Sequence, residues 1–161
     1  MSIEKMNFWD SNYFKHPQLT DEMISIAENI LKVKLPTLLL DLLKIQNGGY
    51  TKGFAYPMTV KTTWAENRVP LSELFGIVTD KTIETAQNIL DSAYMTKEWG
   101  LPEKQVLLIG DGHWWITLDY RNGDNPNVRW VDVECNEDIL VADNFDNFIN
   151  GLVSEDRYAE E

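Results

Sequence analysis

The residues of this chain whose side chains could carry out chemistry gather in its last third. They are Asp111, His113, Asp119, Asp132, Glu134 and Cys135. A general acid or base must lie within hydrogen-bond reach of its substrate, and Asp119 and Asp132 would approach each other if their strands pair. Asp119 also stands directly before the turn sequence YRNG (120–123). Because aspartate oxygens commonly accept hydrogen bonds from turn amides, a structural role is the favoured interpretation.

A metal or nucleophile site is less well supported by the spacing of these residues. His113 with Asp111 matches no recognised ligand pattern, and the only other histidine, His16, lies far away in the sequence. Cys135 is the single cysteine and would need a histidine base supplied by the fold. The sequence has no glycine-rich phosphate motif and no nucleophile elbow. We therefore predict a protein that is not an enzyme and has no cofactor or metal; a metal-dependent enzyme using Asp111, His113 and Asp132 is the least favoured alternative.

The charge of the chain is strongly negative and unevenly distributed. Fourteen Lys and Arg against 26 Asp and Glu give a net charge of −12. Residues 110–150 hold nine acids and only two bases, Arg121 and Arg129. A field of this sign repels phosphate backbones and raises the encounter rate with basic partners, so we predict no direct nucleic-acid binding.

The pattern of apolar residues and the single cysteine indicate the cellular compartment in which the protein is expected to work. No apolar run is long enough for a signal peptide or a membrane span. One cysteine excludes an internal disulfide framework. We expect a cytoplasmic protein that does not contact a membrane.

Helical periodicity predicts four helices that could position these side chains. The first begins after Thr20, and the second is the leucine-rich run that starts near Pro36. Asn47, Gly48 and Gly49 follow the second helix, so they predict a left-handed helix end rather than a phosphate cradle, which precedes a helix. A short turn or helix is predicted to begin at Pro70 and Leu71. A third helix is predicted over residues 82–95, and Gly100 and Pro102 are expected to stop it. A fourth helix, capped by Asp143, carries an apolar face near residue 148.

The last third of the chain predicts strands. They cover residues 106–109, 114–120 and 128–134, with turns at 110–112 and 122–126. Helices followed by an antiparallel sheet and a closing helix indicate an α+β fold, with the helices packed on a mostly antiparallel sheet. We predict one domain over residues 1–153 and an acidic C-terminal tail over residues 154–161.

Alternation along the predicted strands assigns the tryptophans to faces. Trp114 falls with Ile116 on the core side, whereas Trp115 falls with Asp119 on the wetter side. Trp130 shares a face with Asp132 and Glu134, and core packing and partner contact are equally favoured for it.

Three segments together resemble the SUKH superfamily of Smi/Knr-like proteins. They are LKVKLPTLLLDLLKIQNGG (31–49), EWGLPEKQVLLIGDGHWWITLDYRNGDNPNVRWVDVE (98–134) and VADNFDNFINGL (141–152). Their order and spacing carry the resemblance, which covers about residues 20–153. The resemblance implies an α+β domain; many bacterial members look like immunity proteins that bind a cognate toxin, and fungal members are regulators of cell-wall synthesis.

The leading hypothesis is a non-catalytic immunity protein that binds and neutralises a toxin through an acidic surface. The toxin is expected to be basic or to process nucleic acids, because carboxylates would mimic phosphates. The alternative is a regulatory scaffold in cell-wall or stress signalling. The predicted partner-binding residues are Trp115, Asp119, Trp130, Asp132, Glu134, Glu137 and Asp138.

Overall fold

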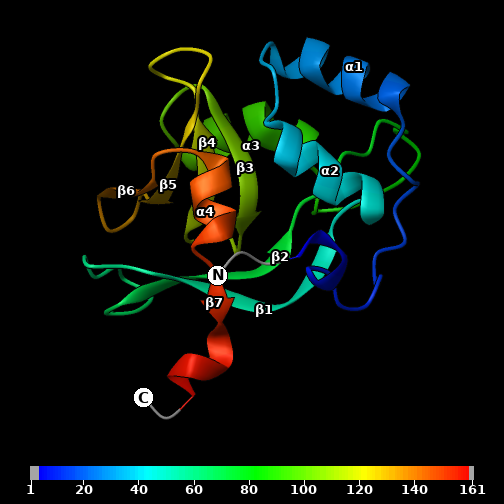
Figure 1. The fold of residues 1–161 in the computed structure, drawn as a ribbon. Helices are drawn as coiled ribbons and strands as arrows, with labels where there is room; N and C mark the ends of the chain where they lie inside the picture. Colours follow the sequence, from blue (N-terminus) through cyan, green and yellow to red (C-terminus); the bar gives the residue numbers. More distant parts are fainter. Residues whose placement is uncertain (1–3, 160–161) are drawn as a thin grey trace.

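The computed structural model describes residues 4–159 and has an α+β architecture (Figure 1). The α-helices are α1 (Asp21–Leu31), α2 (Thr37–Ile45), α3 (Ser92–Trp99) and α4 (Phe145–Asn150). Short 3-10 helices are η1 (Lys5–Asn7), η2 (Ile89–Asp91) and η3 (Glu155–Tyr158). The strands are β1 (Gly49–Pro57), β2 (Arg68–Leu74), β3 (Gln105–Gly110), β4 (Trp115–Asp119), β5 (Asn127–Asp132), β6 (Glu137–Ala142) and β7 (Val153–Ser154).

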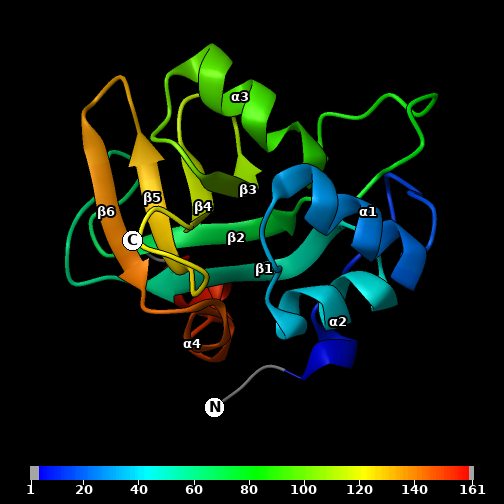
Figure 2. The same ribbon diagram turned by 90° about the horizontal axis from the view of Figure 1, so that it is seen from above.

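The strands form two antiparallel sheets. The order is β2-β1-β7 in the three-stranded sheet and β3-β4-β5-β6 in the four-stranded sheet. The four-stranded sheet is a meander, so each strand pairs with the next one in the chain. Figure 2 shows α1 and α2 on one side of the molecule and β6 at the opposite edge. The predicted α+β fold is confirmed, with the sheet divided into two parts.

The first two helices begin close to the predicted residues. The Thr20 hydroxyl accepts a hydrogen bond from the Met23 amide at 3.2 Å, which caps α1. In α2, Leu39, Leu42 and Leu43 are buried, as the wide apolar stripe predicts. Ile30 of α1 differs from the expectation, because it is 53% exposed although its spacing assigns it to the apolar face.

The end of α2 is a buried polar junction rather than a simple left-handed cap. Gly48 and Gly49 have φ of 87° and 127°, so only the glycines adopt left-handed backbone. Asn47 is buried and does not form the left-handed cap; its side-chain amide makes hydrogen bonds to the backbone of residues 17 and 77. A Cβ on Gly48 would lie 2.5 Å from the Gly76 amide nitrogen, so the two chain segments touch backbone to backbone.

Two predictions for residues 70–95 are wrong. Residues 70–71 lie inside β2, which tolerates Pro70 because β2 is an edge strand. Residues 82–88 form a turn, bends and irregular backbone that ends in a β-bridge from Asn88 to Gly76, and α3 begins only at Ser92. Local side-chain hydrogen bonds replace the helix there: the Asp80 carboxylate accepts from the Thr82 amide at 2.9 Å, and the Asn88 amide donates to the Val78 carbonyl at 2.9 Å. The predicted stop after this helix is correct, since Gly100 ends α3 in the left-handed conformation.

The N-terminal segment contributes to the core, which the periodicity did not indicate. Phe8 is fully buried, and its ring stacks on Phe54 at a centroid distance of 5.6 Å. The Trp9 indole donates to the Leu42 carbonyl at 2.9 Å. This segment therefore joins α2 to β1.

Residues near the C-terminal end lie against β1. Phe54 pairs with Ser154 and Ala55 with Val153, so β7 completes the three-stranded sheet. The Arg68 guanidinium lies 4.4 Å from the centroid of the Tyr158 ring. The predicted domain boundary at residue 153 falls inside β7.

Candidate partner-binding surface

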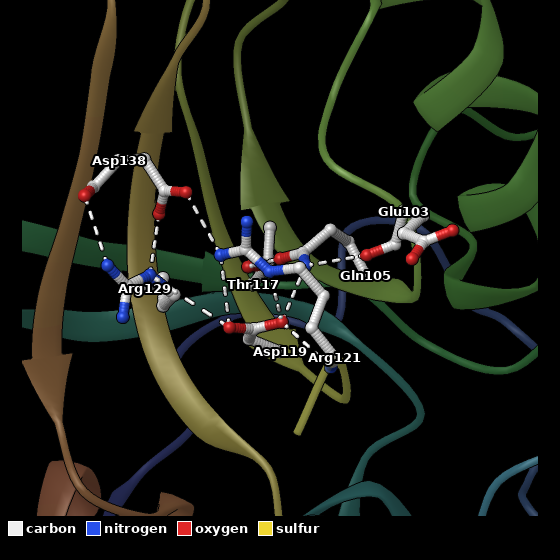
Figure 3. A network of polar contacts seen from close by, with 7 residues as sticks. All are labelled: Glu103, Gln105, Thr117, Asp119, Arg121, Arg129 and Asp138. Carbon is white, nitrogen blue, oxygen red and sulfur yellow. Dashed lines mark hydrogen bonds and ion pairs between the residues drawn. The ribbon is translucent and has the colours of Figure 1, made fainter. Parts of the chain in front are cut away.

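A network of two aspartates and two arginines lies across the four-stranded sheet (Figure 3). Asp119, at the end of β4, accepts hydrogen bonds from the Arg121 amide at 3.0 Å and from its Nε at 2.9 Å. The Arg121 Nη2 also donates to the other Asp119 oxygen at 3.1 Å and to Asp138 at 2.9 Å. Arg129 of β5 pairs with the same Asp138. The turn after β4 thus folds back and ties β4 to β6.

The contacts of this network favour the charged forms of Asp119 and Arg121. Burial raises the pKa of the Asp119 carboxyl, but hydrogen bonds from Arg121 and Gln105 outweigh burial and leave the pKa below its ordinary value. Hydrogen bonds and charges from Asp119 and Asp138 raise the pKa of Arg121. Two carboxylates and two guanidinium groups therefore neutralise each other at this place.

Neutral polar groups extend the network toward β3. The Gln105 amide donates to Asp119 at 2.8 Å and to the Glu103 carbonyl at 3.0 Å. The Thr117 hydroxyl donates to the Gln105 carbonyl oxygen at 2.5 Å. The side chains of Gln105, Thr117 and Asp119 are all buried, so their polar atoms need these hydrogen bonds in place of water.

A second polar cluster joins the loop at residues 58–67 to the β5–β6 hairpin. The Thr63 hydroxyl donates to Asp132 at 2.7 Å, and the Thr63 amide donates to Glu137 at 2.9 Å. The Trp130 indole donates to the same Glu137 oxygen at 3.0 Å. Asp132 is 5% exposed and also accepts from the Cys135 amide at 3.2 Å. These carboxylates hold a loop and a turn in place.

The predicted exposure of Trp115 and Asp119 is wrong. Each is only 3% exposed, and all five residues of β4 are buried. A central strand that is covered on both faces gives no exposed side to alternate with the core. Gly110 makes room for the indole, because a Cβ at this position would lie 2.0 Å from the Trp115 ring.

Trp130 lies in the core, which is one of the two interpretations that the sequence left equally favoured. It has no exposed surface, and its ring stacks on Trp114 at a centroid distance of 4.8 Å and an interplanar angle of 14°. Trp114, assigned to the core side, is only partly buried.

The β5–β6 hairpin carries exposed and half-buried side chains at its edge, and we call five of them the hairpin surface. It consists of Val133, Glu134, Glu137, Asp138 and Leu140. Val133 and Leu140 are 39% and 46% exposed. A shallow hollow of about 360 Å³ adjoins it, between the end of α3 and the hairpin. Among the predicted contact residues, Glu134, Glu137 and Asp138 belong to this surface, whereas the other four are buried.

The remaining candidate residues, Asp111 and His113, stabilise a turn or are exposed to solvent. Asp111 accepts hydrogen bonds from the His113 and Trp114 amides at 2.8 and 3.1 Å, as a turn-forming aspartate does. His113 lies 3.7 Å from Glu134, and both side chains are 72% exposed. Within residues 4–159, no group of three or more His, Cys, Asp or Glu is placed to hold a metal ion.

The residues of the two polar clusters that the sequence prediction missed are Thr63, Gln105, Thr117, Arg121 and Arg129. The two arginines carried a signal, since they are the only bases of an acidic stretch and could have been paired with its aspartates. Thr63 carried none, because 69 residues separate it from its partner Asp132.

Taken together, the geometry defines a single-domain α+β protein with an ion-pair network across its four-stranded sheet and an exposed hairpin edge. The chain belongs to the SMI1 / KNR4 family (SUKH-1), whose family model matches residues 18–151. No curated protein sequence matches the chain. Over the part of the chain that the structure describes, none of the helices has the length and apolar character needed to cross a bilayer.

Proposed function

We propose that this protein is a non-catalytic immunity protein that binds and neutralises a cognate bacterial toxin in the cytoplasm. Membership of the SMI1 / KNR4 family over residues 18–151 carries the proposal, because the family resemblance implies toxin binding. The net charge of −12 supports a basic partner, since a field of one sign steers oppositely charged proteins toward each other.

The hairpin surface is the proposed contact. Val133 and Leu140 supply exposed apolar area of the kind that desolvates well at an interface centre. Glu134 is exposed, and His113 is its one ion-pair partner among the described residues, which leaves this carboxylate available to a basic side chain. Four buried residues support this surface indirectly, because they fix the strands and turns that present it: Trp115, Asp119, Trp130 and Asp132.

The arginine pairing modifies the expected mechanism of phosphate mimicry. Asp119 and Asp138 are paired with Arg121 and Arg129, so they contribute little to the local field. The attraction of a basic toxin then arises from the net charge of the whole chain, and Glu134 supplies the local carboxylate. Association should slow as added salt screens this field, whose range is about 10 Å at 0.1 M ionic strength.

Co-expression tests the proposal. The chain is produced together with the toxin-like reading frame that neighbours its gene, and growth and co-purification are both scored. We expect growth to be restored and the two proteins to purify together. Growth arrest despite good expression of both chains, without a complex, would contradict immunity; a lone gene would favour a regulatory scaffold instead.

A further inference from the structure

A pocket of about 480 Å³ lies between the end of α1, the start of α3 and the first residues of β3. Its volume falls within the range of about 300–1,000 Å³ that is typical of small-molecule sites. The walls are mainly apolar and include Leu31, Val33, Leu90, Ala93 and Val106. Ile30, which is 53% exposed, lies on this wall rather than in the core.

Two lysines line this pocket and carry its positive charge. Lys32 and Lys104 are exposed, and neither makes an ion pair among the described residues. Asp124 is the single carboxylate in the lining. The pocket therefore has a net positive charge although the chain carries −12. This local reversal of sign favours an anionic ligand.

Both lysines have an unusual backbone conformation for a residue with a side chain. Lys32 and Lys104 have φ of 60° and 57°, a region that glycine occupies more readily. The sequence thus places long cationic side chains at positions where the backbone alone favours glycine.

The pocket wall also holds a hydroxyl with no partner. Thr96 lines the pocket, and its buried Oγ1 makes no hydrogen bond to any described residue. Buried hydroxyls are nearly always bonded, and a ligand oxygen could provide the missing partner after rotation of this side chain.

We propose that the pocket binds a small organic anion with an apolar body, such as a medium-chain carboxylate. The chain of the ligand fills the apolar walls, and its carboxylate meets the ammonium groups of Lys32 and Lys104. This site is separate from the hairpin surface, so it does not depend on toxin binding.

Titration calorimetry with decanoate, and with 1-decanol as its neutral counterpart, tests the proposal on the full chain. We expect decanoate to bind more tightly than decanol and to shift the amide resonances of the residues around the pocket. The double variant K32G/K104G removes both charges and suits the left-handed backbone, so it should fold normally. Loss of the attraction between the two exposed ammonium groups and the ligand carboxylate should make decanoate binding about tenfold weaker in this variant, with decanol binding unchanged.

Two further variants make the outcome decisive. Lys15→Gly is the matched control, because Lys15 also has a positive φ, of 50°, but lies outside the pocket; it should leave decanoate binding unchanged. Ala93→Trp should fill the pocket and abolish binding of both probes. The absence of decanoate binding to the unmodified chain, or equal binding to K32G/K104G, would overturn the proposal.

Discussion

The side chain of Asn47 hydrogen-bonds both backbone groups of Ile77. Its Oδ1 accepts from the Ile77 amide at 2.8 Å, and its Nδ2 donates to the Ile77 carbonyl at 2.7 Å. The same Nδ2 donates to the Pro17 carbonyl at 2.8 Å. The His16 ring bonds the Asn47 backbone carbonyl at 2.8 Å. One buried amide thus joins the end of α2 to two segments far from it in the sequence.

Replacement of Asn47 by aspartate should destabilise the fold strongly. A carboxylate of the same shape removes both donors and leaves the Pro17 and Ile77 carbonyls without them. We expect a loss of about 2–4 kcal/mol in the free energy of unfolding, measured by urea titration. Asn29→Ala, on the exposed face of α1, is the control and should change it by less than about 0.5 kcal/mol. Equal stability of N47D and the wild type would contradict the assigned role.

Two glycine-to-alanine variants should show separately how much stability is lost through crowding of the backbone and through strain at a positive φ. A Cβ on Gly76 would lie 2.3 Å from the Asn47 carbonyl oxygen, whereas a Cβ on Gly112 would meet nothing within 4 Å. Gly112 instead has a φ of 95°. Gly112→Ala should therefore cost about 1–2 kcal/mol from strain alone. Gly76→Ala should cost about 3 kcal/mol or more from crowding. The reverse order in thermal melts would disprove this assignment.

The pairing of Asp119 with Arg121 should make stability depend on pH. The pKa of Asp119 is lowered in the folded chain, so its pairing stabilises the fold at pH values above the unfolded pKa of about 3.9. This contribution is lost as the pH falls through the lower, folded pKa. Asp119→Asn should cost about 1–3 kcal/mol at pH 7, and the difference from the wild type should shrink toward pH 3. A difference that stayed constant between these two pH values would count against the pairing.

The thiol of Cys135 should react slowly for an exposed cysteine. Partial desolvation, the carboxylates of Asp132 and Glu137, and Glu134 all raise its pKa, which reduces the thiolate present at neutral pH. Alkylation by the neutral reagent iodoacetamide should therefore be slower than for a free thiol at neutral pH, and its rate should still rise with pH where the rate for a free thiol has levelled off. Glu134→Gln removes one of these charges and should increase the rate at pH 8. No response of the rate to this substitution would contradict the electrostatic cause.

Charge reversal on the hairpin surface should weaken toxin binding more than the same change elsewhere. Glu134→Lys alters an exposed side chain whose one ion-pair partner is His113. Glu84→Lys is the matched control, because Glu84 is also exposed and belongs to the segment between β2 and η2. Figure 2 shows the long loop of this segment on the opposite side of the molecule from β6. Once the toxin is identified, both variants should slow association through the changed net charge, but only E134K should speed dissociation. Equal dissociation rates would exclude Glu134 from the contact.

The sequence predicted those elements whose signals are local. The Thr20 cap, the leucine stripe of α2 and the glycine that ends α3 were correct, and three strands of the last third were predicted. The fourth strand, β6, was not predicted, and α4 is capped by Asn144 rather than by Asp143. Side-chain caps, helical spacing and turn residues act over a few positions, so one short window contains the whole signal. The fold class followed from the order of these elements.

The sequence could not predict features that depend on distant partners. Thr63 binds Asp132 across 69 residues, and Phe8 stacks on Phe54. Alternation failed for β4 because a strand covered on both faces has no wet side. The acidic charge of residues 110–150 was visible, but its partial neutralisation by Arg121 and Arg129 depends on the register of β4, β5 and β6.

The pairing of β7 with β1 has a consequence for the order of folding. Phe54 and Ser154 lie about 100 residues apart in the chain, so forming their contact closes a very long loop at a large entropic cost. Each strand of the β3–β6 meander meets its neighbour over a short turn, and such local contacts form quickly. The meander should therefore nucleate the fold, and the β1–β7 pairing should close in its final step.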